Sequence, residues 1–128
     1  MTSTGSLTDT VVRYAEAIER LVPTARTLAD WDPVAAFIAV EDFERVGTFL
    51  EVQDWPQYTE MLSRWASSID SFETTVRRVT EAQGLVYFEV EERHRRGDVV
   101  TVANSLTVFA FDAAGRITHL DVYLQQAR

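Results

Sequence analysis

The sequence predicts an α+β fold, a cone-shaped roll of about three N-terminal helices packed on a strongly curved, mostly antiparallel sheet. Two observations support this fold class. From about Ser71 to Gln125, four segments of alternating apolar residues follow one another and are joined by short turns. The segments before them carry apolar residues at helical spacing. A sheet that bends around helices leaves a hollow, so a small-molecule site is expected inside the cone.

Helical sequence occupies the first part of the chain. The first helix is expected over Thr8 to Leu21, and Pro23 ends it. A shorter helical piece over residues 24–29 is expected to follow. A further helical segment begins at Asp32-Pro33, because aspartate caps helices and proline is tolerated at the first position, and it extends to about Val40.

The middle of the chain contains a short strand and a well-defined helix. The strand is expected over Phe43 to Leu50, with Gly47 marking a bulge or a close approach of the backbone. Asp54 and Gln57 then form the signature of a capping box at a helix start. One apolar stripe of this helix carries Tyr58, Met61, Leu62, Trp65 and Ile69.

The four strands that follow are separated by residues suited to tight reversals. The strands are expected over residues 71–83, 85–96, 98–112 and 116–126. The turns are expected at Gln83-Gly84, at Arg96-Gly97-Asp98 and from Asp112 to Gly115.

Composition excludes several classes of function. The 128 residues fit a single domain, with residues 1–6 expected as a short flexible tail. The net charge of -8 disfavours nucleic acid, and Arg93 to Arg96 is interpreted as a solvated hairpin tip. No apolar run could span a membrane and no signal peptide is evident, so a cytoplasmic protein is expected. The absence of cysteine, the two distant histidines and the lack of a glycine-rich phosphate loop predict no metal and no cofactor.

Several stretches resemble the nuclear transport factor 2-like superfamily, in particular its SnoaL-like and ketosteroid isomerase-like members. Val12 to Ala15 resembles the first helix of ketosteroid isomerases, and Phe37 to Asp42 resembles the segment that leads into the family's first strand. Phe109 to Ile117 resembles its hairpin, and His119 to Tyr123 resembles the closing strand of SnoaL-like polyketide cyclases. The resemblance implies a conical pocket, frequent homodimers, and functions that include isomerase, cyclase, hydrolase and plain binding.

The resemblance implies a role for Tyr14, but this sequence lacks the carboxylates that the family usually carries. The matching tyrosine of ketosteroid isomerases donates to an oxyanion; alternatively, Tyr14 packs in the core with its hydroxyl bonded to the backbone. Counting from the matching segments, the family's carboxylates correspond to Gly47, Thr107 and Val122. These three residues cannot transfer a proton at neutral pH.

Asp121 is the nearest carboxylate to those positions. It precedes Val122 by one residue, and alternation along a strand would place it on the opposite face. A bulge between Gly115 and Asp121 would return it to the pocket. Otherwise His119, Asp121 and Tyr123 lie on the outer face, where a dimer partner could contact them.

Other polar residues are candidates for binding. Arg45 shares a face with Phe43 that is expected to point inward, where it would hold a carboxylate or phenolate ligand; the alternative is a pair with a nearby glutamate. His94 could act as an acid or base at the pocket mouth, or be exposed. Asn104 interrupts an apolar strand face and is expected to contact either a ligand or a dimer partner.

Aromatic residues complete the expected site, and they are equally suited to filling the core. The candidates are Trp31, Trp55, Tyr58 and Trp65.

The leading interpretation is a SnoaL-like domain that binds an apolar or aromatic compound. As an enzyme it would transfer protons on a cyclic or polyketide-like substrate, with Tyr14 donating and Asp121 or His94 exchanging the proton. The alternative is a non-catalytic ligand-binding or dimerisation module with a filled cone. A homodimer through the outer sheet face is expected, because both faces of the third long strand are largely apolar.

Overall fold

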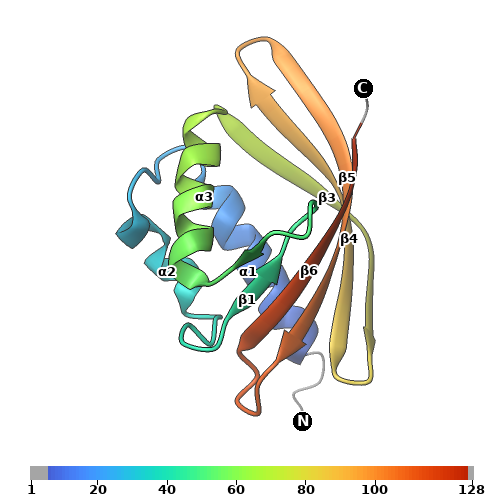
Figure 1. Cartoon of the computed structure of the whole chain (residues 1–128). Helices are drawn as coiled ribbons and strands as arrows, with labels where there is room; N and C mark the ends of the chain where they lie inside the picture. Colours follow the sequence, from blue (N-terminus) through green and yellow to red (C-terminus); the bar gives the residue numbers. More distant parts are fainter. Residues whose placement is uncertain (1–5, 127–128) are drawn as a thin grey trace.

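The computed structural model describes residues 6–126, in which helices precede a large sheet (Figure 1). The helices are α1 (Ser6–Leu21), the 3-10 helix η1 (Leu28–Trp31), α2 (Asp32–Ala35) and α3 (Trp55–Ser67). The strands are β1 (Glu44–Val46), β2 (Val52–Gln53), β3 (Ser71–Ala82), β4 (Leu85–Arg96), β5 (Val99–Phe111) and β6 (Ile117–Gln126). The expected tail lies outside the described residues, apart from Ser6, at which α1 begins.

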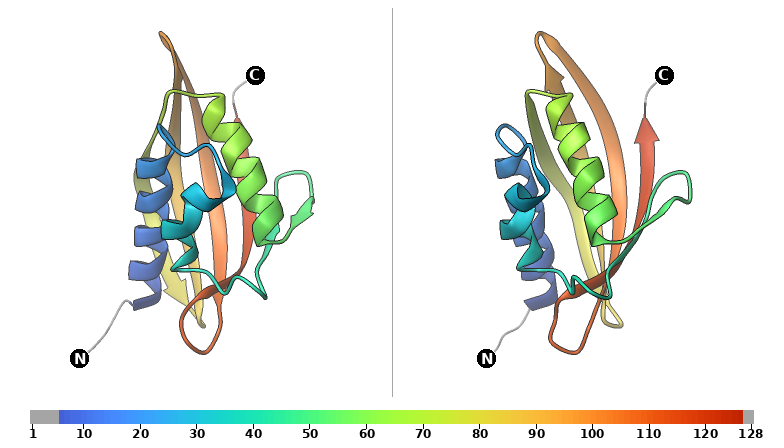
Figure 2. Two further views of the ribbon diagram at one scale, coloured as in Figure 1. Left: turned by 90° about the vertical axis from the view of Figure 1, so that its left-hand side faces the viewer. Right: turned by 60° about the vertical axis from the view of Figure 1, so that its left-hand side comes forward.

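The strands form one six-stranded sheet in the order β2-β1-β6-β5-β4-β3. β1 runs parallel to β6, and the other neighbouring strands are antiparallel. The helices α1, α2 and α3 lie on the same side of the long, curved strands in both views of Figure 2. The predicted α+β roll is therefore confirmed.

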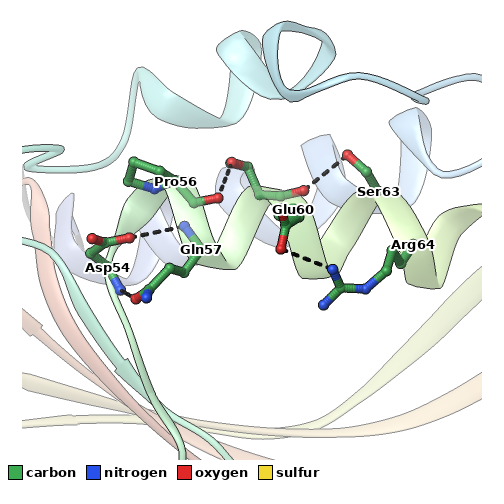
Figure 3. Close-up of polar contacts among 7 residues, drawn as sticks. Asp54, Pro56, Gln57, Glu60, Ser63 and Arg64 are labelled. Carbon is green, nitrogen blue, oxygen red and sulfur yellow. Dashed lines mark hydrogen bonds and ion pairs between the residues drawn. The ribbon is translucent and has the colours of Figure 1, made fainter.

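The capping box at the start of α3 forms as the sequence predicts. The Asp54 carboxylate accepts from the backbone N–H of Gln57 at 2.9 Å, and the Gln57 side chain accepts from the Asp54 backbone N–H at 2.9 Å (Figure 3). On the exposed side of the same helix, Arg64 donates to Glu60 at 2.9 Å. The helix start is therefore fixed one turn before the side chains that face the sheet.

The four long strands and their turns match the expected pattern. Gly97 and Gly115 have φ values of 61° and 82°, a region that favours glycine and allows each tight reversal. At the β5–β6 turn, the Asp112 carboxylate accepts from the backbone N–H groups of Arg116 and Ala114 at 2.9 Å. These bonds, led by the one from Arg116, lower the pKa of Asp112.

Three predictions for the first half are wrong in extent. The piece expected over residues 24–29 is η1, further along the chain, and the segment from Asp32 leaves helical geometry after Ala35 rather than at Val40. The strand expected over Phe43–Leu50 is instead a hairpin, in which β1 pairs with β2. The chain reverses because the Leu50 N–H donates to the Gly47 carbonyl and Leu50 adopts a φ of 66°.

Three aromatic residues expected around a ligand belong to the core instead. Trp31 is fully buried, and its Nε1 donates to the Ser63 hydroxyl at 2.9 Å. Phe43 and Trp55 are also buried and meet edge to face, with ring centroids 5.5 Å apart. None of the three lines the cavity described below. A fully packed aromatic side chain stabilises the core through its large apolar surface.

Candidate functional site

A cavity of about 530 Å³ lies between the helices and the inner face of the sheet. Helices α1 and α3, the β1–β2 hairpin and strands β3 to β6 all contribute side chains to it. Its walls are mainly apolar and include Ile18, Leu62, Trp65, Phe72, Phe88 and Phe109. A cavity of this size, with few polar groups, is suited to a small apolar ligand.

Two tyrosines form the first polar group in this cavity. Tyr14 from α1 and Tyr58 from α3 are both buried, and their hydroxyl oxygens are 2.5 Å apart. Burial is the main cause that raises the pKa of each phenol. The two tyrosine hydroxyls carry one proton each, and only one of these protons can form the hydrogen bond between the two oxygens. Among residues 6–126 neither hydroxyl has another hydrogen-bond partner, so one proton remains to be donated to a ligand oxygen.

Arg45 places a positive charge beside this pair. Its guanidinium carbon lies 5.2 Å from the ring centroid of Tyr58, a cation–π contact. Its Nη1 donates to the Gln53 side chain at 2.8 Å and lies 3.7 Å from the Glu51 carboxylate. Arg45 therefore lines the cavity and also pairs with a glutamate, which was the alternative expected for it. Its charge partly opposes the rise in the pKa of both tyrosines.

Glu92 and His94 form a second polar group on β4. They point to the same face of the strand and both line the cavity, and His94 Nε2 is 2.9 Å from Glu92 Oε1. The His94 ring packs against both Trp65 and Phe72, with centroid distances of 5.7 Å and 5.1 Å. Because the carboxylate accepts, the neutral ring carries its proton on Nε2. Within the described residues Nδ1 has no hydrogen-bond partner, so its lone pair can take a proton.

The inner face of β5 adds two hydroxyls. Thr107 pairs with Val122 across β5 and β6, and both side chains line the cavity. Ser105 lies two residues before Thr107 and also lines it. The positions at which the resemblance implies acids therefore do face the ligand space, but they carry threonine and valine.

Gly47 has a steric reason to lack a side chain. A Cβ built on Gly47 would collide with the carboxylate of Glu51, which folds back from the hairpin turn. That carboxylate also accepts from the backbone N–H of Phe49 at 2.9 Å. Backbone hydrogen bonds, first that of Glu51 itself, lower the pKa of the carboxyl group. An acid at position 47 would therefore require the end of the flexible Glu51 side chain to move aside.

Comparison with solved structures identifies the fold. No protein-family model and no curated relative matches the sequence. A crystal structure from Anabaena variabilis, described as nuclear transport factor 2-like, matches with a TM-score of 0.77 and 15% identity over 99% of this chain and 96% of that chain. The chain has the nuclear transport factor 2-like fold.

Two proteins with this same fold carry more specific descriptions. IdmH from Streptomyces antibioticus, provisionally described as a polyketide cyclase, matches with a TM-score of 0.76 and 13% identity over 92% of this chain and 91% of that chain. A provisionally assigned SnoaL-like polyketide cyclase from Shewanella denitrificans matches with a TM-score of 0.74 and 12% identity over 93% and 90%. At these identities the likeness concerns the fold.

Within this nuclear transport factor 2-like fold, Asp121 lies on the wrong face for proton transfer in the cavity. A bulge is present on β6 in the expected stretch, since Phe111 pairs with Ile117 and Ala110 with His119, but it does not return Asp121 to the cavity. Leu120 and Val122 therefore line the cavity, and Asp121 lies on the outer face. There the carboxylate is 2.9 Å from His119 Nε2, and His119 Nδ1 is 3.1 Å from Glu44.

Asn104 is likewise on the outer face. Its Nδ2 lies 3.5 Å from the Gln125 side chain, and Asn104 does not line the cavity. A ligand contact for Asn104 inside the cone is therefore excluded by its position. The predicted residues that the fold brings together around the cavity are Tyr14, Arg45, Tyr58, Trp65, His94, Thr107 and Val122.

The residues of the site that were not predicted include two polar ones, Glu92 and Ser105. Glu92 lies among charged residues near a hairpin tip, a context typical of solvent exposure, and Ser105 is a small residue in an apolar strand. Alternation along the strand could have identified Glu92 as inward-facing, since it follows the inward Phe88 and Val90 at a spacing of two. Among residues 6–126 no cluster suited to a metal ion is found, and no helix is long and apolar enough to span a membrane.

Proposed function

We propose that the chain binds a small apolar or aromatic carbonyl compound and transfers a proton on it, as an isomerase or cyclase type of enzyme. One observation carries this proposal. The buried Tyr14–Tyr58 pair, with one proton left to donate, faces the same cavity as His94, whose ring is held by Glu92. An oxyanion donor and a positioned base are the two groups that enolisation requires.

The proposed step begins with the ligand carbonyl oxygen at the tyrosine pair. His94 lies further along β4 than the residues level with the tyrosine pair, so its Nδ1 takes a proton from a ligand carbon that is conjugated with the carbonyl, and the C–H electron pair moves through the conjugated system to form the enolate. The enolate oxygen accepts the free tyrosine proton as a hydrogen bond, while Arg45 provides positive charge nearby. In an isomerisation, protonated His94 returns the proton to another carbon of the ligand.

In a cyclisation the enolate has a different fate. Its carbon attacks a second carbonyl of the same molecule and forms a carbon–carbon bond. The new alkoxide then takes the proton from His94, so the base is regenerated. The provisional description of IdmH as a polyketide cyclase supports this class for a chain of the same fold.

Hydrogen–deuterium exchange of 2-tetralone in D₂O tests the proposal without the natural substrate. This bicyclic ketone has acidic protons beside its carbonyl, and NMR follows their loss. We expect the protein to accelerate exchange. Tyr14→Phe should lower the rate by about 10²–10³-fold, as for loss of an oxyanion donor, and His94→Gln by about 10²–10⁴-fold, as for loss of a general base.

The chain contains a matched control for the base. His119 is the other histidine and lies on the outer face of the sheet, so His119→Gln should leave the exchange rate unchanged. Exchange that depends equally on both histidines would contradict the assignment of His94. An unaccelerated rate with bound 2-tetralone would contradict proton transfer and leave a binding domain.

A non-catalytic ligand-binding module is the second candidate. It is favoured by the absence of acids at Gly47, Thr107 and Val122, and by the position of Asp121 outside the cavity. The same cavity would then bind an apolar compound without chemistry. A cone filled by its own aromatic side chains agrees poorly with an open volume of about 530 Å³.

We also propose that two copies pair through the outer face of the sheet. Val100, Val102 and Tyr123 are exposed there by 52%, 44% and 58%. The helices of residues 6–126 all lie on the opposite side, so none of them covers this face. A second copy would remove these apolar side chains from water.

A further inference from the structure

Ser105 is the buried polar side chain that the proposed chemistry leaves unexplained. It is only 7% exposed, and among residues 6–126 no hydrogen bond of its hydroxyl is found. Its ladder partners are Val90 on β4 and Leu124 on β6, which both line the cavity. Residues directly opposite each other on paired strands point to the same face, so the Ser105 hydroxyl points into the cavity. A buried hydroxyl without a partner costs free energy unless a ligand satisfies it.

The position of Ser105 relative to the tyrosines defines a second end of the ligand space. The Phe109 ring packs against Tyr14 at 5.5 Å between centroids, so Phe109 marks the tyrosine end. Along β5, Thr107 lies about 7 Å and Ser105 about 13 Å from Phe109, at a rise of about 3.3 Å per residue. A ligand that reaches both groups is therefore elongated, with its two oxygen functions at opposite ends.

The charge around Ser105 selects the kind of oxygen function. Ser105 stands opposite Val90, so Glu92, two residues further on β4, is its diagonal neighbour, about 7–8 Å away. Glu92 also lines the cavity, and its negative charge disfavours a carboxylate beside it. A neutral hydroxyl suits the position, because it can donate to one group and accept from another.

We propose that Ser105, supported by Thr107, forms a second polar subsite that binds a neutral hydroxyl group of the ligand. The ligand class is then an elongated, mainly apolar carbonyl compound that carries an alcohol or phenol at the end remote from the carbonyl. The inference rests on the proposed function, because the carbonyl end is assigned to the tyrosine pair.

Calorimetric titration with matched ketones tests the subsite. The probes are 2-tetralone, which has the carbonyl alone, and its 6-hydroxy and 7-hydroxy derivatives. We expect at least one hydroxyl derivative to bind about three- to tenfold more tightly than 2-tetralone, the usual net effect of one added hydrogen bond. Ser105→Ala should abolish this gain and leave the affinity for 2-tetralone unchanged.

Two controls accompany this measurement. Asn104→Ala changes the adjacent residue, which points to the outer face, and should leave the gain intact. 2-Tetralone-6-carboxylic acid should bind more weakly than 2-tetralone, because its carboxylate would meet Glu92. Equal or tighter binding of the acid would overturn the assignment of a neutral group.

The outcomes separate this inference from the proposed function. If 2-tetralone binds but neither hydroxyl derivative binds more tightly, the Ser105 subsite is wrong and the carbonyl site stands. A gain that survives Ser105→Ala also overturns the subsite. If none of the ketones binds, the proposed function fails and the subsite fails with it. The comparison of probes on the unsubstituted protein remains decisive even if Ser105→Ala does not fold.

Discussion

At the scale of single residues, the tyrosine pair is the feature with the clearest physical consequence. Tyr14 and Tyr58 are buried from two different helices, and their hydroxyls share one proton position. Burial disfavours the phenolate, and for Tyr14 the neighbouring Tyr58 raises the pKa further. Both groups therefore stay neutral as donors across the physiological range.

The raised pKa of Tyr14 predicts a loss of stability at alkaline pH. In the unfolded chain tyrosine ionises near pH ~10, whereas in the folded protein the phenol keeps its proton to a higher pH. The unfolded state therefore binds fewer protons above pH ~10, and the free energy of unfolding falls as pH rises. Urea unfolding from pH 8 to pH 11.5 should show this decline.

Tyr14→Phe is the control for that titration. Phenylalanine cannot ionise, so the variant should lose stability less steeply above pH ~10. Near neutral pH it should be less stable by about 1 kcal/mol, because Tyr58 loses its hydrogen-bond partner. Parallel pH profiles for the two proteins would contradict a buried, neutral Tyr14.

At the scale of secondary-structure elements, the start of α3 positions part of the site. Tyr58 lies in the first turn of this helix, directly after the capping box of Asp54 and Gln57. Fraying of the first turn would therefore move one member of the tyrosine pair. A local cap, readable from the sequence, thus supports the geometry of the cavity.

Asp54→Ala measures the contribution of this cap. Alanine cannot accept from the Gln57 N–H, so we expect the free energy of unfolding to fall by about 1 kcal/mol, within the 0.5–2 kcal/mol usual for caps. Chemical denaturation gives the value. Asp54→Asn is the matched control, because asparagine caps as well as aspartate, and it should cost little. Equal losses for both variants would argue against the cap.

The elements differ in how far the sequence predicts them. Strands β3 to β6 are predicted almost to the residue because alternation is long and Gly84, Gly97 and Gly115 mark the turns. The β1–β2 hairpin is missed because Leu50, a residue that rarely adopts positive φ, occupies the turn position where glycine is expected.

The sequence predicts which side chains line the cavity only where alternation along a strand determines the direction in which they point. Thr107 and Val122 face the cavity as counted, and Asp121 lies on the opposite face from its neighbour Val122, beyond the bulge in β6. Glu92 is missed because composition near a hairpin tip indicates exposure, whereas the strand carries it inward. The core positions of Trp31 and Trp55 depend on how helices pack, which spacing along one helix does not determine.

At the scale of the whole molecule, the two faces of the sheet have different roles. The inner face, covered by α1 and α3, carries the cavity (Figure 2). The outer face carries exposed apolar side chains beside the chain of contacts from Glu44 through His119 to Asp121. This division places the proposed ligand and the proposed second copy on opposite sides of one layer.

Pairing through the outer face predicts a change in mass on a single substitution. Tyr123 is 58% exposed on this face, and Tyr123→Glu would place a charge in the contact. Sedimentation equilibrium should show a dimer for the unsubstituted protein and a monomer for the variant. Arg64→Glu, on the exposed side of α3, should leave the dimer intact. A monomer in every case would contradict the pairing.

The collision between a side chain at Gly47 and the Glu51 carboxylate constrains how this chain could acquire a new acid. A single exchange of Gly47 for aspartate would bring two negative charges into one volume and displace the partner of Arg45. The colliding atoms are the far end of a flexible, partly exposed side chain, so an acid introduced at position 47 would displace Glu51 towards solvent and compete with it for Arg45.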